Sequence, residues 1–375
     1  MGLTSNTLLV VAVAVAVLLF VGTVWLWPRL ARRRWRTVGA RIGVLLATQV
    51  AVFASIGLAA NQAFGFYASW ADLLGQETSQ GVVVDHDGIR GGGGPLRVVD
   101  TRQMDVAGGS RSQLGGQIQK VVIVGRTTGI AGPAYVYLPP EYFQPRYRTR
   151  TFPAVVVLTG YPGTAEALIK GLRYPQTAHQ LAGEGRAQPM ILVMMRPTVA
   201  PPRDTECVDV PGGPQTESFF AEDLPDAVGH HYRVGRKPGS WGVVGDSTGG
   251  YCALKLAVHH PEVYAAGAGL SPYYKAPIDP TTGDLFQGNK TLRNEADLFW
   301  YLGNRPAPDT SLLVSSSKQG ESDYRATLDF IKLVKSRQPT RISSIVLDSG
   351  GHNFNTWRRE IPATLQWISG RLSDR

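Results

Sequence analysis

The sequence lacks the usual signals of metal and nucleotide cofactors. Its 375 residues include only two cysteines and seven histidines, and these are not grouped at metal-ligand spacing. No Gly-x-Gly-x-x-Gly follows a predicted strand, and the four glycines at 91–94 are not followed by the Gly-Lys-Ser or Gly-Lys-Thr of a phosphate loop. We therefore expect a protein that uses no metal and no cofactor.

Basic residues are concentrated in one short segment. The formal net charge is +9, from 38 Lys and Arg against 29 Asp and Glu. Much of this excess comes from six neighbouring arginines: Arg29, Arg32, Arg33, Arg34, Arg36 and Arg41. Nucleic-acid binding needs basic residues gathered on a folded face, so this distribution gives no support for a nucleic-acid partner.

The arginine segment separates two long apolar runs, Thr7–Trp27 and Ile42–Ala60. Each is close to the ~20 residues that cross a hydrocarbon layer of ~30 Å. The runs are flanked by aromatic residues typical of membrane interfaces: Trp25, Trp27, Phe64, Phe66, Tyr67 and Trp70. A cleaved signal peptide is the alternative for the first run, but no basic residue precedes that run and no small-residue cleavage site follows it. We predict a two-helix membrane anchor with the arginine loop in the cytoplasm and the rest of the chain outside.

The chain after the anchor divides into a linker and a folded domain. We expect residues 1–75 to form the anchor, the Gly-rich residues 76–116 a linker, and residues 117–375 the domain. Apolar runs alternate with helix-like stretches there, which predicts an α/β fold with a mostly parallel sheet flanked by helices. The expected strands are Val121–Val124, Ala134–Leu138, Ala154–Leu158, Met190–Met194, Trp241–Val244, Ala265–Leu270, Leu312–Ser315 and Ile342–Leu347. The expected helices are Thr216–Tyr232, Thr248–His259, Ser322–Ser336 and Phe354–Leu372.

One predicted strand runs through a glycine-rich turn into a predicted helix. The turn reads Gly-Asp-Ser-Thr-Gly-Gly from Gly245, with Ser247 at its centre. Side chains at Gly245 and Gly249 would collide with neighbouring backbone, which explains the glycines of a Gly-x-Ser-x-Gly nucleophile elbow. The alternative is an ordinary serine at a helix start. The flanking strand and helix favour Ser247 as a nucleophile.

A serine hydroxyl is a weak nucleophile until a base takes its proton. Among the seven histidines, only His352 lies between the last predicted strand and the last predicted helix. The order nucleophile, acid, histidine along the chain is that of α/β-hydrolases. We therefore predict His352 as the base, the alternative being a surface residue at the start of a helix.

The acid of the triad is expected after the penultimate strand, where Glu321 and Asp323 both qualify. We prefer Glu321, because Asp323 falls in the first turn of the next helix and its charge would serve that helix terminus. The oxyanion needs two backbone donors, one from the residue after the nucleophile, Thr248, and one from the loop after an early strand. Tyr161 is the second choice, since Pro162 has no N–H.

Three segments together resemble a known esterase family. They are Gly160-Tyr161-Pro162-Gly163, the elbow around Ser247, and Gly350-Gly351-His352-Asn353-Phe354-Asn355-Thr356-Trp357. The chain from Val121 to Leu372 is similar to the family that includes esterase D and the secreted mycolyltransferases of the antigen 85 type. The resemblance implies an α/β-hydrolase fold and hydrolysis or transfer of an acyl group from a small-molecule or lipid ester, without a cofactor.

Two alternatives remain open beside a general esterase. A cell-envelope acyltransferase would use the same triad, but residues 164–177 lack the acidic, tryptophan-containing sugar-binding stretch of the mycolyltransferases. A non-catalytic binding module on a hydrolase fold is the other alternative, because a fold does not guarantee an activity.

Cys207 and Cys252 are the only cysteines of the chain. In a domain outside the cytoplasm we predict that they form a disulfide. Two buried thiols acting as small apolar side chains are the alternative.

Overall fold

The computed structural model describes residues 5–31, 35–64, 94–104, 111–201 and 203–373. The chain separates into two compact units, Met1–Thr78 and Ser79–Arg375. Several residues of the predicted anchor and most of the predicted linker lie outside the described residues, including Arg32, Arg33, Arg34, Phe66, Tyr67 and Trp70.

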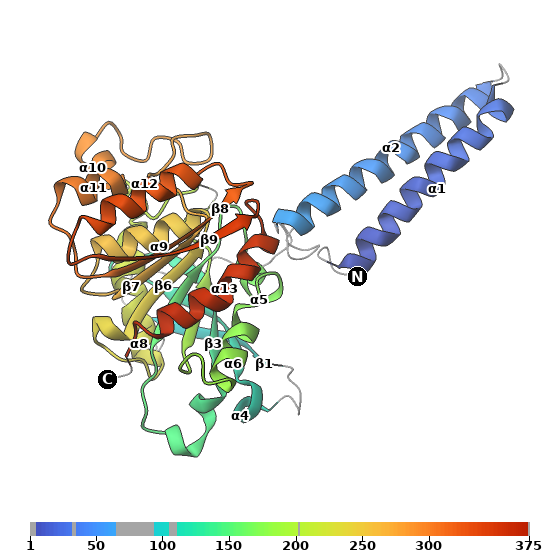
Figure 1. The fold of residues 1–375 in the computed structure, drawn as a ribbon. Coiled ribbons are helices and arrows are strands. Elements are labelled where there is room, and N and C mark those ends of the chain that lie inside the picture. Colours follow the sequence, from blue (N-terminus) through green and yellow to red (C-terminus); the bar gives the residue numbers. More distant parts are fainter. Residues whose placement is uncertain (1–4, 32–34, 65–93, 105–110, 202, 374–375) are drawn as a thin grey trace. The chain divides into compact units, whose positions relative to one another are not determined.

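The first unit contains two long helices, α1 (Asn6–Leu30) and α2 (Trp35–Phe64), which pack on each other as a hairpin (Figure 1). Both are long and apolar enough to cross a membrane. A hydrogen bond of 3.0 Å joins the hydroxyls of Thr23 and Thr48 across the helix interface. Large apolar side chains nevertheless point outward, and Phe53 is 72% exposed. An apolar surface of this kind is favourable only when something other than water covers it.

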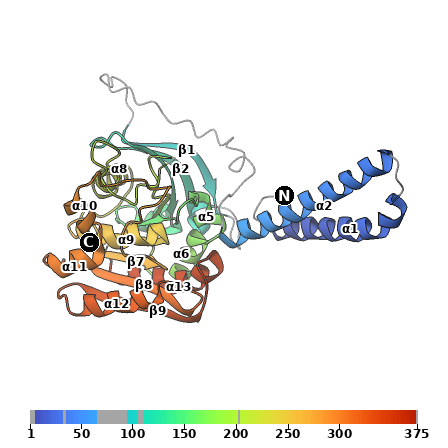
Figure 2. The ribbon, with the colours of Figure 1, turned by 90° about the horizontal axis from the view of Figure 1, so that it is seen from above.

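Within the described residues of the second unit, nine strands form one sheet in the order β1-β2-β3-β5-β4-β6-β7-β8-β9. Neighbours from β5 to β9 in this order are parallel, whereas β1, β2 and β3 pair antiparallel, as do β3 and β5. Figure 2 shows β1 and β9 at opposite edges. The mostly parallel sheet flanked by helices confirms the predicted fold class. The strands are β1 (Leu96–Gln103), β2 (Gln117–Val124), β3 (Ala131–Leu138), β4 (Ala154–Leu158), β5 (Ile191–Met195), β6 (Trp241–Asp246), β7 (Ala266–Leu270), β8 (Ser311–Gln319) and β9 (Arg341–Ser349).

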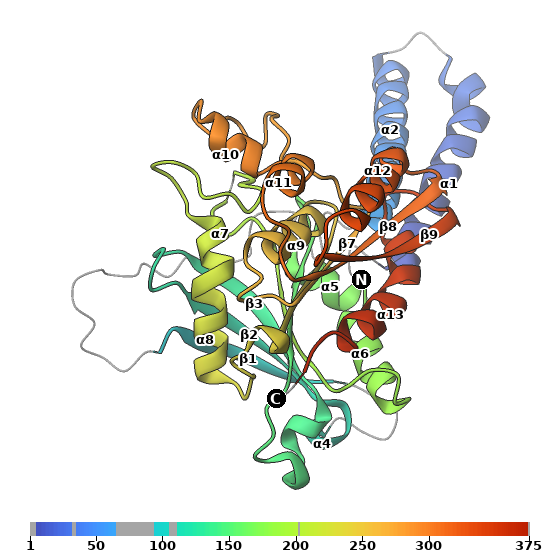
Figure 3. The same cartoon turned by 60° about the vertical axis from the view of Figure 1, so that its left-hand side comes forward.

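Helices cover both faces of the sheet, so its central strands are apolar throughout. Every residue of β4 is buried, and alternate side chains enter different cores. Val156 belongs to the core that contains residues of α8, α9 and α12, whereas Val155 belongs to the core that contains residues of α5, α6 and α13. Figure 3 shows these two groups of helices on opposite sides of the sheet. Their bounds are α5 (Ala165–Lys170), α6 (Tyr174–Gly183), α8 (Leu224–His231), α9 (Thr248–His259), α12 (Tyr324–Lys335) and α13 (Phe354–Ser369).

All eight predicted strands and all four predicted helical stretches are present, with ends that differ by a few residues. The stretch predicted from Thr216 is divided into α7 (Thr216–Ser218), a π-helical turn (Phe219–Asp223) and α8. Other short helices carry no apolar repeat long enough to be recognised: α4 (Ser112–Gly115), α5, α6, α10 (Lys290–Glu295) and α11 (Leu298–Asn304). The remaining helical turns are 3₁₀ turns at Pro140–Phe143, Pro145–Tyr147 and Pro238–Ser240.

The predicted linker is wrong for residues 96–103, which form the edge strand β1. This strand pairs with β2, from Leu96 opposite Ile123 to Gln103 opposite Gln117. Only Leu96 is buried, and the pairing shifts between Val98 and Asp100. A strand that is exposed on both faces and irregular in register has no alternating pattern, so its sequence resembles a loop.

Candidate active site

The carboxyl ends of the parallel strands bring the predicted catalytic side chains together at one edge of the sheet. Ser247 follows β6, Glu321 follows β8 and His352 follows β9. Parallel strands present their carboxyl ends to the same side, so residues 105 positions apart in the chain can meet there.

Ser247 lies on a sharp turn between β6 and α9. Its φ of 53° and ψ of −120° are a conformation that residues other than glycine rarely adopt. A Cβ at Gly245 would lie 2.2 Å from the carbonyl carbon of Gly249, and one at Gly249 would lie 2.3 Å from the Leu158 carbonyl oxygen. The glycines therefore allow the elbow to press against its own helix and against β4, and the strained turn presents the serine hydroxyl at the sheet edge.

His352 contacts both Ser247 and Glu321. Its Nε2 lies 2.8 Å from the Ser247 Oγ, and its Nδ1 lies 3.4 Å from Glu321 Oε2. The Glu321 side chain is 3% exposed and that of His352 is 43% exposed.

Asp323, the alternative acid, lies at the N-cap of α12 and accepts no capping hydrogen bond from that helix. Its predicted role at that helix terminus therefore rests on its charge and not on a hydrogen bond. Its charge still contributes to the field at His352, behind that of Glu321. The structure thus brings Glu321, and not Asp323, into contact with the histidine.

Two side chains that sequence reasoning missed hold Glu321 in place. Ser271 Oγ donates to Glu321 Oε1 at 2.7 Å, and Trp357 Nε1 donates to Ser271 Oγ at 2.9 Å. The Trp357 ring also meets the His352 ring edge-on, with centroids 5.1 Å apart. Trp357 belongs to the segment that carries the family resemblance, but Ser271 only follows β7, and no motif marks it.

The charges around His352 favour its protonated form. Burial opposes that charge, but the hydrogen bond and the charge of Glu321, together with Asp246, outweigh burial and raise the pKa of His352. Burial also raises the pKa of Asp246 to about 7, although the Gly160 N–H donates to its Oδ2 at 2.9 Å. This bond ties the loop after β4 to the elbow.

The loop after β4 lies against Ser247. A Cβ at Gly160 would lie 2.9 Å from the Ser247 Cβ, and Tyr161 is the next residue of that loop. Thr248 begins α9, where the first amides of a helix have no partner within the helix. Both predicted oxyanion donors thus border Ser247, and their role stays a prediction.

A comparison with known proteins places this geometry in a family. The family described as Putative esterase matches residues 126–368, which include all three predicted triad residues. The chain belongs to this family. It is therefore an esterase-family protein with an α/β-hydrolase fold.

Individual relatives are more distant. An uncharacterized protein of Corynebacterium glutamicum is 25% identical over 248 residues, which are 64% of this chain and 58% of that protein, so the match spans little more than half of the relative. A ferulic acid esterase has a TM-score of 0.57 at 16% identity, covering 68% of this chain and 98% of its own.

Two further solved structures share the fold of this esterase-family chain. An S-formylglutathione hydrolase of Agrobacterium tumefaciens has a TM-score of 0.57 at 16% identity, covering 74% of this chain and 99% of its own. MPT51 of Mycobacterium tuberculosis has a TM-score of 0.50 at 17% identity, covering 67% of this chain and 97% of its own.

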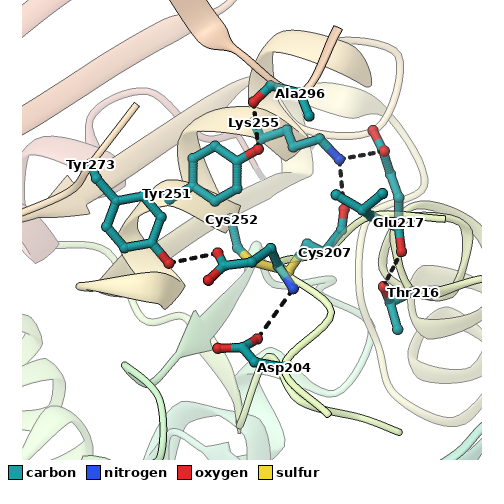
Figure 4. Close-up of a disulfide and its surroundings, with 11 residues drawn as sticks. Asp204, Cys207, Thr216, Glu217, Tyr251, Cys252, Lys255, Tyr273 and Ala296 are labelled. Carbon is teal, nitrogen blue, oxygen red and sulfur yellow. Dashed lines mark hydrogen bonds and ion pairs between the residues drawn. A yellow bond between two sulfur atoms is a disulfide. The ribbon is translucent and has the colours of Figure 1, made fainter. Parts of the chain in front are cut away.

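The structure joins the two cysteines of this esterase-family chain in a disulfide between Cys207 and Cys252 on α9 (Figure 4). The region lies among buried ionisable groups, which include Lys255 and Glu217. Within the described part of the chain, no group of three or more His, Cys, Asp or Glu is placed to hold a metal ion.

Proposed function

We propose that this chain hydrolyses carboxylic esters through an acyl-enzyme on Ser247, with His352 as base and Glu321 as the acid that orients it. The observation that carries the proposal is the 2.8 Å contact between His352 Nε2 and the Ser247 Oγ on a strained elbow. A nucleophile within hydrogen-bond reach of a base that a third group orients is the arrangement that activates a serine.

The reaction follows from these positions. Nε2 of His352 takes the hydroxyl proton while the Ser247 Oγ attacks the ester carbonyl, and the tetrahedral oxyanion accepts hydrogen bonds from the Thr248 and Tyr161 amides. The imidazolium then protonates the departing alcohol, which leaves the acyl group on the serine. Water, deprotonated by the same histidine, attacks the acyl-enzyme and releases the carboxylic acid together with the free serine.

A fluorophosphonate probe tests the nucleophile directly. The wild-type chain in detergent is expected to be labelled and to hydrolyse a short acyl ester, and Ser247→Ala is expected to lose both activities. Loss of a triad serine costs on the order of 10⁶ in kcat. Labelling that survives in Ser247→Ala would place the nucleophile elsewhere, and a chain that is not labelled and not active would favour a binding module.

An assay with an added acyl acceptor distinguishes hydrolysis from acyl transfer. An esterase is expected to release only the free acid when a sugar or lipid alcohol is added to the assay, because water reacts with the acyl-enzyme. A new ester of the added alcohol, formed in preference to the acid, would identify an acyltransferase. Product analysis by mass spectrometry with esters of graded acyl length also reports the preferred substrate.

We further propose that α1 and α2 anchor the enzyme in a membrane, with the arginine loop in the cytoplasm and the catalytic domain outside. The support is the length of both helices and their exposed apolar side chains, such as Leu18 and Phe53. The proposed arrangement is an anchor at residues 1–75, followed by a lead-in segment and the catalytic domain. Protease added to intact cells should remove the catalytic domain. A domain that survives until lysis would reverse the orientation.

A further inference from the structure

The segment after β5, residues 203–215, is fastened to α9; we call it the cystine loop. Cys207 is bonded to Cys252, and Lys255 Nζ, one turn further along α9, donates to the Cys207 carbonyl oxygen at 2.6 Å. The Lys255 side chain is 1% exposed and also pairs with Glu217 of α7 (Figure 4). A covalent bond and a buried cation thus hold the same residue of the loop.

The backbone of the cystine loop is strained at the point where it is fastened. Glu206 and Cys207 both have φ of 49°, in the left-handed region that disfavours side chains with a Cβ. Strain of this kind persists only where surrounding contacts over-determine it, as the disulfide and Lys255 do here. Asp204 Oδ1 accepts the Glu206 N–H at 3.1 Å, and Glu206 itself is 2% exposed. The strained pair therefore keeps the Glu206 carboxyl in the interior.

The buried carboxyl of Glu206 is bonded to Tyr273, in the segment between β7 and α10. The Tyr273 hydroxyl donates to Glu206 Oε2 at 2.5 Å. The Tyr273 ring stacks on that of Tyr251, with centroids 5.2 Å apart and planes 22° apart. Burial, the charge of Glu206 and the hydrogen bond to Glu206 raise the pKa of Tyr273 well above its ordinary value. Tyr273 thus links the buried carboxyl of Glu206 to Tyr251 in the first turn of α9.

That first turn has few other side chains by which it can be held. Its remaining residues are Gly249 and Gly250, and a Cβ at Gly249 has no space beside β4. Tyr251 lies three residues after Thr248 on the same face of α9, and Tyr273 stacks on Tyr251. Tyr273 therefore adds, from outside the elbow, a contact to the turn that carries the Thr248 amide.

We propose that Tyr273 and Glu206 are positioning residues that hold the Thr248 amide in place to meet the oxyanion, and that the Cys207–Cys252 disulfide keeps Glu206 in that position. This inference rests on the proposed ester hydrolysis. It adds a series of contacts that supports the oxyanion site and runs from the disulfide through Glu206 and Tyr273 to the first turn of α9.

The protonation state of Glu206 makes this positioning, and with it kcat, dependent on pH. Burial raises the pKa of Glu206 to about 8, and the charges of Asp204 and Asp279 act in the same direction. The hydrogen bond from Tyr273 and the charge of Lys255 act against that rise. Glu206 is therefore mostly neutral at pH 7, and above about pH 8 it becomes a second buried carboxylate beside Asp204. We expect kcat to decline above that pH.

Tyr273→Phe tests the inference in the full-length chain in detergent micelles. It removes the hydroxyl that bonds Glu206 and keeps the ring that stacks on Tyr251. We expect kcat for a short acyl ester to fall about 10-fold or more, because small displacements at a reacting centre are costly, while KM changes by less than about twofold. Tyr274→Phe is the matched control, since the Tyr274 hydroxyl is also buried but donates to Thr327. Equal kcat in the two variants would overturn the inference.

Two further variants separate positioning from a loss of stability. Glu206→Gln keeps an acceptor for Tyr273 without a titrating group, so it should retain kcat at pH 7 and lose the decline above about pH 8. Replacing both cysteines by alanine should lower kcat, and adding Tyr273→Phe should then cost little more, because the two changes break one chain of contacts. A decline of kcat above about pH 8 that persists in Glu206→Gln would contradict the proposed positioning role. Losses of kcat that are fully additive between the cysteine replacements and Tyr273→Phe would contradict it as well.

The wild-type control keeps the two proposals distinguishable. If the wild-type chain is neither labelled by a fluorophosphonate nor active on esters, the proposed function fails and the inference fails with it. If the wild-type chain is active and Tyr273→Phe matches Tyr274→Phe in kcat, only the positioning role fails.

Discussion

The two halves of the candidate active site are built by different physical means. The elbow around Ser247 is shaped by local sterics, since Gly245 and Gly249 have no space for a Cβ beside neighbouring backbone. The Glu321–His352 half is instead held by side-chain hydrogen bonds that pass through Ser271 and Trp357. Backbone collisions cannot be relieved gradually, whereas a hydrogen-bonded chain can lose one member and keep part of its geometry. We therefore expect a single substitution at an elbow glycine to abolish activity, whereas single substitutions around Glu321 should each remove only part of it.

The largest effect is expected for Gly249→Ala. The new Cβ would lie 2.3 Å from the Leu158 carbonyl oxygen, so the elbow and β4 cannot both keep their places. We expect a loss of about 3 kcal/mol or more in the free energy of unfolding, together with loss of fluorophosphonate labelling. Gly229→Ala in α8 is the control, because a Cβ there meets nothing within 4 Å. Wild-type labelling in Gly249→Ala would show that the elbow is not sterically determined.

Glu321→Gln should be the next most harmful change. It leaves Ser247 and His352 in place but removes the charge that selects the imidazole tautomer, which costs on the order of 10⁴ in kcat. Asp323→Asn is the paired control and should cost little, since Asp323 makes no contact with His352 in the structure. The assay is ester hydrolysis, with thermal unfolding to show that both variants are folded. An inactive Asp323→Asn and an active Glu321→Gln would assign the acid to Asp323.

Ser271→Ala and Trp357→Phe should give intermediate losses of kcat. Ser271→Ala removes the hydrogen bond to Glu321 and the one from Trp357, whereas Trp357→Phe removes only the bond to Ser271. For each variant we expect kcat to fall about 10- to 100-fold with little change in KM. Trp367→Phe is the control on the same helix, because the Trp367 Nε1 donates to Ser343 of β9 instead. If Trp367→Phe lowers kcat as much as Trp357→Phe does, the effect is general destabilisation of α13 and not loss of orientation.

The smallest effect is a shift in pH dependence. His352 must be neutral to accept the serine proton, so kcat/KM should fall as the pH drops through its raised pKa. Removing the charge of Glu321 takes away the main contribution that favours protonation, so the residual activity of Glu321→Gln should persist to lower pH. The protonated His352 also stabilises the fold below its unfolded pKa, and this stability should be lost as the pH rises through the folded pKa. If the fall of kcat/KM at low pH is the same in Glu321→Gln as in the wild type, Glu321 does not raise the pKa of His352.

The sequence by itself determined the parts of this protein that depend on short-range pattern. Buried strands such as β4 and β6 are continuous apolar runs, and the elbow around Ser247 combines a strand, a glycine turn and a helix within about twenty residues. The order of nucleophile, acid and histidine along the chain then indicated His352 and Glu321, because parallel strands bring their carboxyl ends together. These features follow from periodicity, a short motif and the order of residues along the chain.

Only the tertiary structure decided the contacts between residues that share no pattern. Ser271 meets Trp357 across 86 positions, and Tyr273 meets Glu206 across 67. Strand β1 is defined by its pairing with β2, since most of its own side chains are exposed. A serine after a strand or a glutamate in a loop has many equivalents in the chain. What distinguishes Ser271 and Glu206 is burial beside a particular partner, and that depends on how distant elements pack.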